Sequence, residues 1–168
     1  LEWLVDCGQQ DRARQLVRRL DDELARNRRA PPDNLARIAE LYELLGPRAG
    51  ARAADVARAV ALYGQALEEA GSEGEARWVA GIRHRLARLR LERGRTDRTE
   101  YARAIPLLES ALEAFAGPGD LAERAAIWLD LGDAYAGLEE YGSDHLELAR
   151  EQHEQARVAF AQLGHADQ

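Results

Sequence analysis

An arginine-rich stretch at residues 75–93 carries the side chains of this chain that are best suited to binding chemistry. It holds six arginines and only two acidic residues. An arginine guanidinium can hold a carboxylate or a phosphate through two parallel hydrogen bonds. At the angular spacing of a helix, several of these side chains project away from the apolar arc of the stretch, and Gly81 leaves space beside them. The candidate partner-binding residues are Arg77, His84, Arg85 and Arg88.

The same arginines also admit a structural interpretation. Acidic residues stand at the matching positions of neighbouring predicted helices, so the arginines could bridge helices through surface ion pairs that each contribute little. These acidic residues are Glu40, Glu43, Asp130 and Asp133. Under the binding interpretation, the ligand is an acidic or phosphorylated peptide. Nucleic acid is disfavoured, because the net charge is −7 and the arginine face lacks aromatic rings on which bases could stack.

No residue spacing in the chain is typical of catalysis or of a metal site. His145 and His153 are eight residues apart, which is too far for the i, i+4 histidine pair that binds zinc. Neither a glycine-rich phosphate loop after a strand nor a histidine partner for Cys7 is evident. The sequence therefore predicts a protein that is not an enzyme and that uses no metal and no cofactor.

The composition is that of a highly helical protein. Among the 168 residues, 46% are hydrophobic and 32% are charged, and the helix formers Ala, Leu, Arg and Glu dominate. A single cysteine, Cys7, fits a reducing compartment, so we expect a cytoplasmic protein. No apolar stretch is long enough to cross a bilayer, so no membrane partner is expected. Because the chain begins at Leu1, we expect it to be part of a longer protein.

Apolar periodicity and helix-ending residues divide the chain into helices. Pro31-Pro32 and Gly46-Pro47 are expected to end helices. Asp120 is predicted to cap the helix that follows it in a capping box, and Pro106 is expected to delay or bend its helix. The predicted helices cover residues 11–27, 34–45, 53–70, 75–93, 100–116, 120–137 and 144–163.

A self-similarity with a 45-residue period underlies these helices. The first helix of the last repeat fits the pattern W-x2-L-G-x2-Y at residues 128–135. A large ring, a leucine and a small residue at these offsets lie near one face of a helix, and the glycine lets a second helix approach closely. His153 takes the place of a core ring in the last repeat, so we predict that it packs in the core. The predicted repeat core is Leu41, Ala59, Tyr63, Ala66, Leu86, Ala104, Leu108, Ala111, Trp128, Leu131, Gly132, Tyr135, Ala149 and Ala156.

With these residues the chain resembles the tetratricopeptide repeat (TPR) family, in a long-period variant found in large multidomain bacterial proteins. The usual TPR period is about 34 residues, so the extra residues are expected between the two helices of each repeat. The resemblance implies an all-α, right-handed solenoid of antiparallel helix pairs. The expected organisation is one domain, residues 1–168, with a partial repeat at 1–30 and repeats at 34–71, 75–116 and 120–164.

The resemblance implies a protein–protein interaction module that binds a peptide or protein on its concave face, where it places His84 and Arg88. The carboxylate clamp of chaperone-binding TPR proteins is disfavoured, because that clamp needs lysine and the chain has none. The alternative function is a structural or oligomerising spacer within a larger regulatory or effector protein. Self-association would then use the apolar N-terminal end. The apolar residues of that end are Leu1, Trp3, Leu4 and Val5.

Overall fold

The structure, a computed structural model, describes residues 9–26, 30–48, 53–71, 74–117, 119–138 and 143–166. Within these ranges the regular elements are α-helices and no strand occurs, so the prediction of an all-α protein is confirmed. The N-terminal end that was predicted to self-associate lies outside the described residues, as does Cys7. The chain divides into two compact units, residues 1–74 and 75–168.

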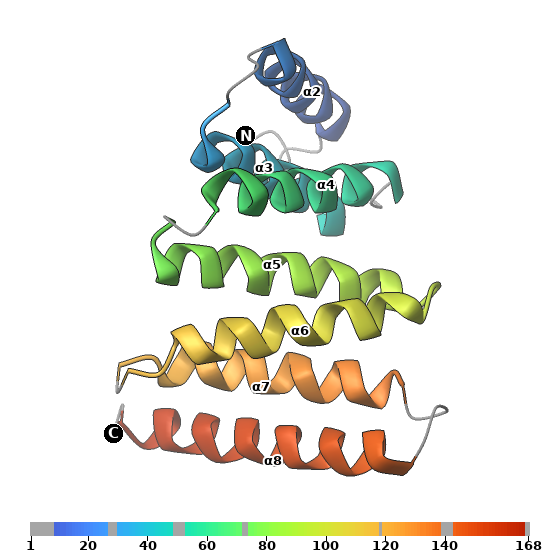
Figure 1. The fold of residues 1–168 in the computed structure, drawn as a ribbon. Helices are drawn as coiled ribbons and strands as arrows, with labels where there is room; N and C mark the ends of the chain where they lie inside the picture. The colour runs from blue at the N-terminus through green and yellow to red at the C-terminus, as the bar shows by residue number, and fades with distance from the viewer. Residues whose placement is uncertain are drawn as a thin grey trace. The chain divides into compact units, whose positions relative to one another are not determined.

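The first unit contains α2 (Gln10–Arg26), α3 (Pro32–Arg48) and α4 (Ala53–Ala70), shown in blue to green in Figure 1. Its most extensive packing joins α3 to α4. Tyr63 of α4 is fully buried, and its hydroxyl donates a hydrogen bond of 2.9 Å to the carboxylate of Glu43 on α3. The tyrosine therefore fills the core with its ring and bonds the polar edge of the neighbouring helix with its hydroxyl.

A charged network links α2 to α4. Arg14 donates to Asp55 at 3.0 Å, and both side chains are buried. Arg58 donates to both oxygens of Asp21, at 2.7 and 2.6 Å, and the Tyr42 hydroxyl donates to the same carboxylate at 3.0 Å. Burial alone would raise the pKa of Asp21, but the hydrogen bonds from Arg58 and Tyr42 outweigh it and lower that pKa. The network thus keeps these buried charges compensated.

The second unit consists of two helical hairpins, α5 (Ala76–Gly94) with α6 (Thr99–Ala114) and α7 (Leu121–Ala136) with α8 (Ser143–Ala166). Figure 1 shows these four helices in chain order, coloured from green to red. In addition, α6 packs against α7, and α5 contacts α7 directly. The first helices of the two hairpins therefore lie side by side.

Most of the predicted repeat core is buried in the structure. Leu41, Trp128 and Tyr135 are only partly buried, and the last two pack against the core cluster that α5, α6 and α7 share. A small residue recurs in the core of each second helix, where helices approach most closely. The buried members of the predicted set are Ala59, Tyr63, Ala66, Leu86, Ala104, Leu108, Ala111, Leu131, Gly132, Ala149 and Ala156.

His153 does not pack in the core, so that prediction was wrong. Its side chain is 40% exposed, and its Nε2 lies 3.1 Å from a carboxylate oxygen of Asp133 on α7. Gly132, one residue earlier on α7, makes this arrangement fit, because a side-chain carbon added at that glycine would overlap the His153 ring. The polar ring prefers a carboxylate at the helix edge to an apolar interior without a partner.

The proline and glycine pairs mark helix boundaries less simply than predicted. Pro32 is the first residue of α3, where its missing N–H costs nothing. The Gly46-Pro47 pair does not end α3, which continues to Arg48. The proline falls in the last turn, and a glycine inside a helix costs only about 1 kcal/mol relative to alanine.

Of two further boundary predictions, one was wrong and the other was wrong in part. Asp120 is the N-cap of α7 but makes no side-chain capping bond; its carboxylate accepts the backbone N–H of Gly117 at 3.0 Å instead. Pro106 does not delay α6, which begins at Thr99 and includes the proline; the alternative, a local bend at Pro106, stays a prediction. Pro106 is exposed, so the carbonyl that loses its donor is close to solvent.

Candidate functional site

The apolar side of α5 turns its arginines outward. Ile82, Leu86 and Leu89 are each no more than 4% exposed, as their helical spacing predicted, and Trp78 is partly buried. The arginines therefore occupy the remaining sides of the helix, from which they reach α6, α7 or solvent.

Arg77 contacts other residues of the protein. Its Nη1 lies 2.5 Å from Asp120 Oδ1 at the start of α7, and its guanidinium lies 5.3 Å from the centre of the Phe115 ring. The hydrogen bond to Asp120 raises the pKa of Arg77 and lowers the pKa of Asp120. Arg77 therefore joins the start of α5 to the start of α7.

His84 also bridges these two helices. Its Nε2 lies 2.7 Å from Asp130 Oδ2, and the two side chains are only 17% and 18% exposed. Since the Arg77 and His84 contacts join equivalent parts of α5 and α7, the two helices run in the same direction. Arg85 is exposed and is not without a partner. Three of the four candidate binding residues thus take part in contacts within the protein.

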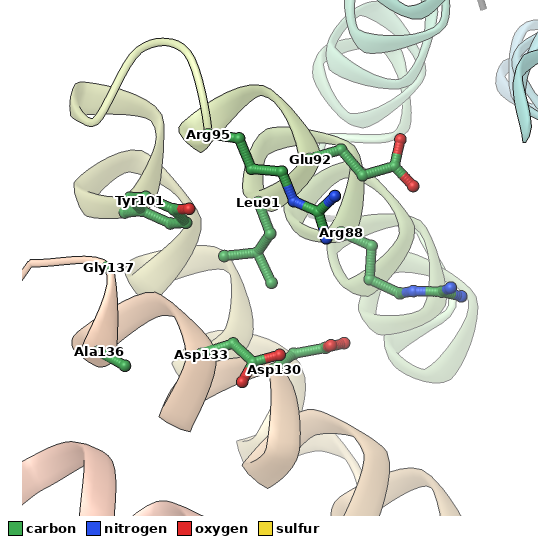
Figure 2. A pocket seen from close by; sticks show the side chains of 9 residues that line it. All are labelled: Arg88, Leu91, Glu92, Arg95, Tyr101, Asp130, Asp133, Ala136 and Gly137. Carbon is green, nitrogen blue, oxygen red and sulfur yellow. The ribbon is translucent and has the colours of Figure 1, made fainter. Parts of the chain in front are cut away.

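Arg88 is the candidate that lies at a cavity. An open cleft of about 350 Å³ lies between α5 and α7, with the start of α6 at one end. Figure 2 shows the guanidinium of Arg95 and the hydroxyl of Tyr101 directed toward the space, whereas the guanidinium of Arg88 points to its outer side. The lining residues are Arg88, Leu91, Glu92, Arg95, Tyr101, Asp130, Asp133, Ala136 and Gly137.

Tyr101 forms a rigid end of the cleft. A side-chain carbon added at Gly94, the last residue of α5, would lie 2.6 Å from the tyrosine ring. One added at Gly137, just after α7, would lie 2.5 Å from the same ring. The two helix ends can close on the ring this tightly because both positions are glycine and have no side chain. The Tyr101 hydroxyl makes no hydrogen bond to any other described residue, so it is available to a ligand.

The two long walls of the cleft differ in charge, because the arginines that line it lie on the α5 side only. On the α5 side, Arg88 and Arg95 are exposed and form no ion pair with the described residues, and the exposed carboxylate of Glu92 lines the same wall. On the α7 side stand Asp130, which His84 holds, and Asp133, whose side chain is 60% exposed. A ligand in this cleft therefore meets two arginines and one carboxylate on the α5 wall, and only carboxylates as charged groups on the α7 wall.

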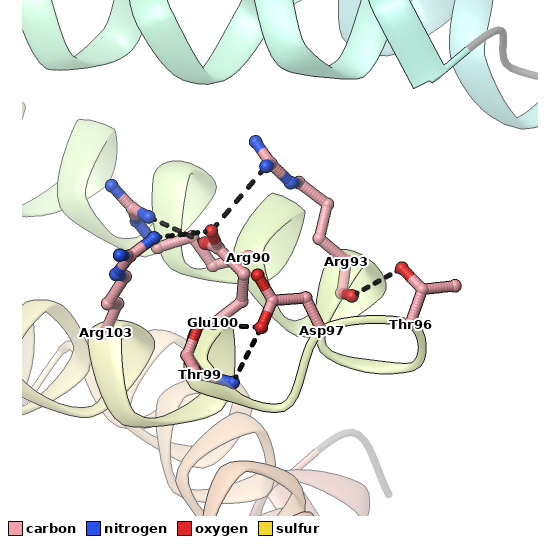
Figure 3. Close-up of polar contacts among 7 residues, drawn as sticks. All are labelled: Arg90, Arg93, Thr96, Asp97, Thr99, Glu100 and Arg103. Carbon is pink, nitrogen blue, oxygen red and sulfur yellow. Dashed lines mark hydrogen bonds and ion pairs between the residues drawn. The ribbon is translucent and has the colours of Figure 1, made fainter.

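A buried carboxylate fixes the turn that presents Tyr101 (Figure 3). Glu100 is 2% exposed and accepts hydrogen bonds from Arg90 at 2.7 Å and from Arg103 at 2.9 Å, with Arg93 3.6 Å away. In the preceding turn, the carboxylate of Asp97 accepts from the backbone N–H and the hydroxyl of Thr99. These bonds hold the first turn of α6 against the end of α5.

Sequence reasoning found only part of this site. Arg88 and the carboxylates of Asp130 and Asp133 were singled out, but Arg95 and Tyr101 were missed. The short connection after Gly94 was a usable signal, because an aromatic residue soon after a helix-ending glycine can pack over that glycine, as Tyr101 does here.

The first unit has a smaller cavity, of about 260 Å³. Its apolar wall includes Leu24, Leu35 and Leu62, and its charged groups, Asp21 and Arg58, are bonded to each other. Both charged groups of this cavity are therefore already paired with each other before any ligand binds.

Comparisons with known proteins identify no relative: no protein-family model, no curated protein and no solved structure matches the chain. Along the described residues, none of the helices has the length and apolarity that crossing a bilayer requires. In the same ranges, no three potential metal ligands of the His, Cys, Asp and Glu types come together.

Proposed function

We propose that the second unit is a protein–protein interaction module of the TPR type, which binds a peptide in the cleft between α5 and α7. The observation that carries this proposal is the cleft, which presents two arginines that pair with no other described residue. It opens between the first helices of two consecutive hairpins. By the TPR resemblance, these helices would line the concave side of a right-handed solenoid.

The packing of the two hairpins supports the repeat interpretation. Leu86 of α5 and Leu131 of α7 are each 3% exposed, and Ala104 of α6 and Ala149 of α8 are no more than 2% exposed. Residues that are equivalent by the 45-residue period thus have equivalent burial in the two hairpins. A repeat architecture requires this equivalence, because each hairpin buries its apolar face against the next.

The size and polarity of the cleft favour a peptide over an apolar small molecule. A volume of about 350 Å³ is at the lower end for ligand sites. Charged residues make up five of the nine lining residues, and the other four are Leu91, Tyr101, Ala136 and Gly137. Such a site suits one or two side chains of an extended peptide whose remainder lies along α5 and α7.

Selection from a random peptide library tests this function. The purified protein should select peptides that lose binding to the Arg88→Glu, Arg95→Glu double variant. They should keep binding to Arg150→Glu, a control that reverses an exposed arginine on α8. Far-UV circular dichroism should show unchanged helicity in each variant. The proposal fails if the library yields no binders, or if the selected peptides do not distinguish the cleft variant from the control.

One observation favours the spacer function instead. Four large apolar side chains of α8 are 37–46% exposed, which leaves apolar surface on the outer helix of this unit. They are Leu146, Leu148, Val158 and Phe160. If α8 joins the protein to a second copy, sedimentation should show an oligomer that Phe160→Gln dissociates. A monomer at all concentrations would exclude this alternative for α8.

A further inference from the structure

The ligand chemistry of the cleft follows from the charges on its two walls. A purely acidic ligand, as first expected from the arginines, would pair with Arg95 but would also face Asp130 and Asp133 across the cleft. A purely basic ligand would pair with Asp130, Asp133 and Glu92, but it would also face the guanidinium of Arg95 in the cleft. Like charges brought together in a cleft oppose binding, and opposite charges favour it. A ligand with one charge of each sign satisfies both walls at once.

We propose that the cleft between α5 and α7 selects a dipolar peptide segment, with an acidic side chain on Arg95 and a basic side chain on Asp133. This proposal rests on the peptide-binding function proposed above and names its ligand class.

The partners are available on both sides. Arg95 has no ion pair among the described residues, and its guanidinium is directed into the space in Figure 2. Asp133 accepts from His153 through Oδ1, and its side chain is 60% exposed, so Oδ2 can accept from a ligand. Tyr101 stands at the end of the cleft with its hydroxyl directed into it. The three groups stand just after α5, in the first turn of α6 and in the last turn of α7.

Asp133 separates this proposal from simple capture of an anion. In the Asp133→Asn variant the side chain keeps its shape and its acceptor for His153, but it loses its charge. A ligand that binds only through the arginines would bind this variant more tightly, because a repulsive charge is gone. A dipolar ligand would bind it more weakly, because an ion pair is gone.

The experiment uses four short peptides with blocked ends, built from alanine and glycine. They carry one Glu and one Arg, two Glu, two Arg, or no charge. Nuclear magnetic resonance titration of the labelled protein follows the backbone amide signals of Arg95, Tyr101 and Asp133. The dipolar peptide should shift these signals at the lowest concentration. Arg95→Gln and Asp133→Asn should each weaken its binding about two- to fivefold, the effect of one exposed ion pair. Glu147→Gln, which neutralises an exposed carboxylate on α8, should leave binding unchanged.

Two results would overturn the dipolar assignment. If the two-Glu peptide binds best and Asp133→Asn tightens it, the cleft is an anion site; the peptide-binding function survives and the dipolar ligand does not. If none of the four peptides shifts the cleft signals, the dipolar ligand is excluded, and the library selection decides on peptide binding separately.

Discussion

Glu100 is the buried charge on which the second unit most clearly depends, and Glu100→Gln is its most informative perturbation. The side chain is 2% exposed, and its two oxygens accept from Arg90 and Arg103 at 2.7 and 2.9 Å. Glutamine keeps the volume of glutamate, but it replaces one acceptor oxygen with an NH₂ group. That donor would face an arginine donor, so at least one hydrogen bond is lost and the positive charges lose their counterion.

The magnitude follows from how far each arginine can reach water. The side chains of Arg93 and Arg103 are 38% and 61% exposed, so both can turn toward solvent. Arg90 is only 22% exposed, and its Nε is buried without a hydrogen-bond partner among the described residues. Breaking a fully buried ion pair costs about 3–5 kcal/mol, and a hydrogen bond to a charged group contributes about 1.5–3 kcal/mol. We therefore expect Glu100→Gln to lower the free energy of unfolding by about 2–3 kcal/mol.

Urea unfolding, followed by circular dichroism and by tryptophan fluorescence, measures this loss. Glu92→Gln is the matched control, because Glu92 is an exposed glutamate on α5 and its change should stay within about 0.5 kcal/mol. In the double variant Arg90→Leu, Glu100→Leu the cost should be smaller than the sum of the two single leucine variants, because neither Arg90 nor Glu100 is left as a buried charge without its partner. A loss below about 1 kcal/mol for Glu100→Gln, or additive leucine variants, would refute the reasoning.

The remaining predictions concern close packing and pH. Gly94→Ala would place a carbon 2.6 Å from the Tyr101 ring and should lower the free energy of unfolding by about 1–3 kcal/mol. Gly81→Ala on the same helix meets open space and should raise it by up to about 1 kcal/mol; equal effects in thermal unfolding would contradict the close approach. Burial and the hydrogen bond to Asp21 raise the pKa of Tyr42 to about 12. In the unfolded chain the tyrosine hydroxyl ionises near pH 10. The stability that the neutral Tyr42 hydroxyl contributes is therefore fully present below about pH 10 and is lost as pH rises through about 12. Tyr42→Phe should therefore flatten the decline in unfolding free energy over that interval, and an unchanged slope in urea unfolding would exclude this contribution.

Much of the secondary structure could be predicted from the sequence, because local residues decide it. The helix predicted at 53–70 matches α4, and the helix predicted at 75–93 differs from α5 by one residue at each end. Helix propensity and apolar periodicity act over a few residues, which a single sequence displays in full. The capping error at Asp120 arose because its side chain had a choice of partner. Asp120 bonds to Gly117 and Arg77 instead of capping its own helix.

The repeat positions were also predictable, because a fixed period brings a small residue to the same close contact in successive hairpins. The alanines at 104 and 149 are both in the core. What the period did not specify is how far a large ring enters that core. Trp128 is partly buried, and the guanidinium of Arg124 lies 4.6 Å from the centre of its ring.

Some features of the candidate site follow from the local sequence, and others depend on contacts between helices. The sequence by itself determined that α5 carries an excess of arginine and that its apolar arc turns these side chains outward. Only the tertiary structure decided which of them stay available to a ligand. Arg77 and His84 meet carboxylates on α7, far along the chain, whereas Arg95 comes to lie beside Tyr101 and opposite Asp133. The physical reason is that an ion pair depends on distances between helices, and those distances are set by how the small and large core residues pack.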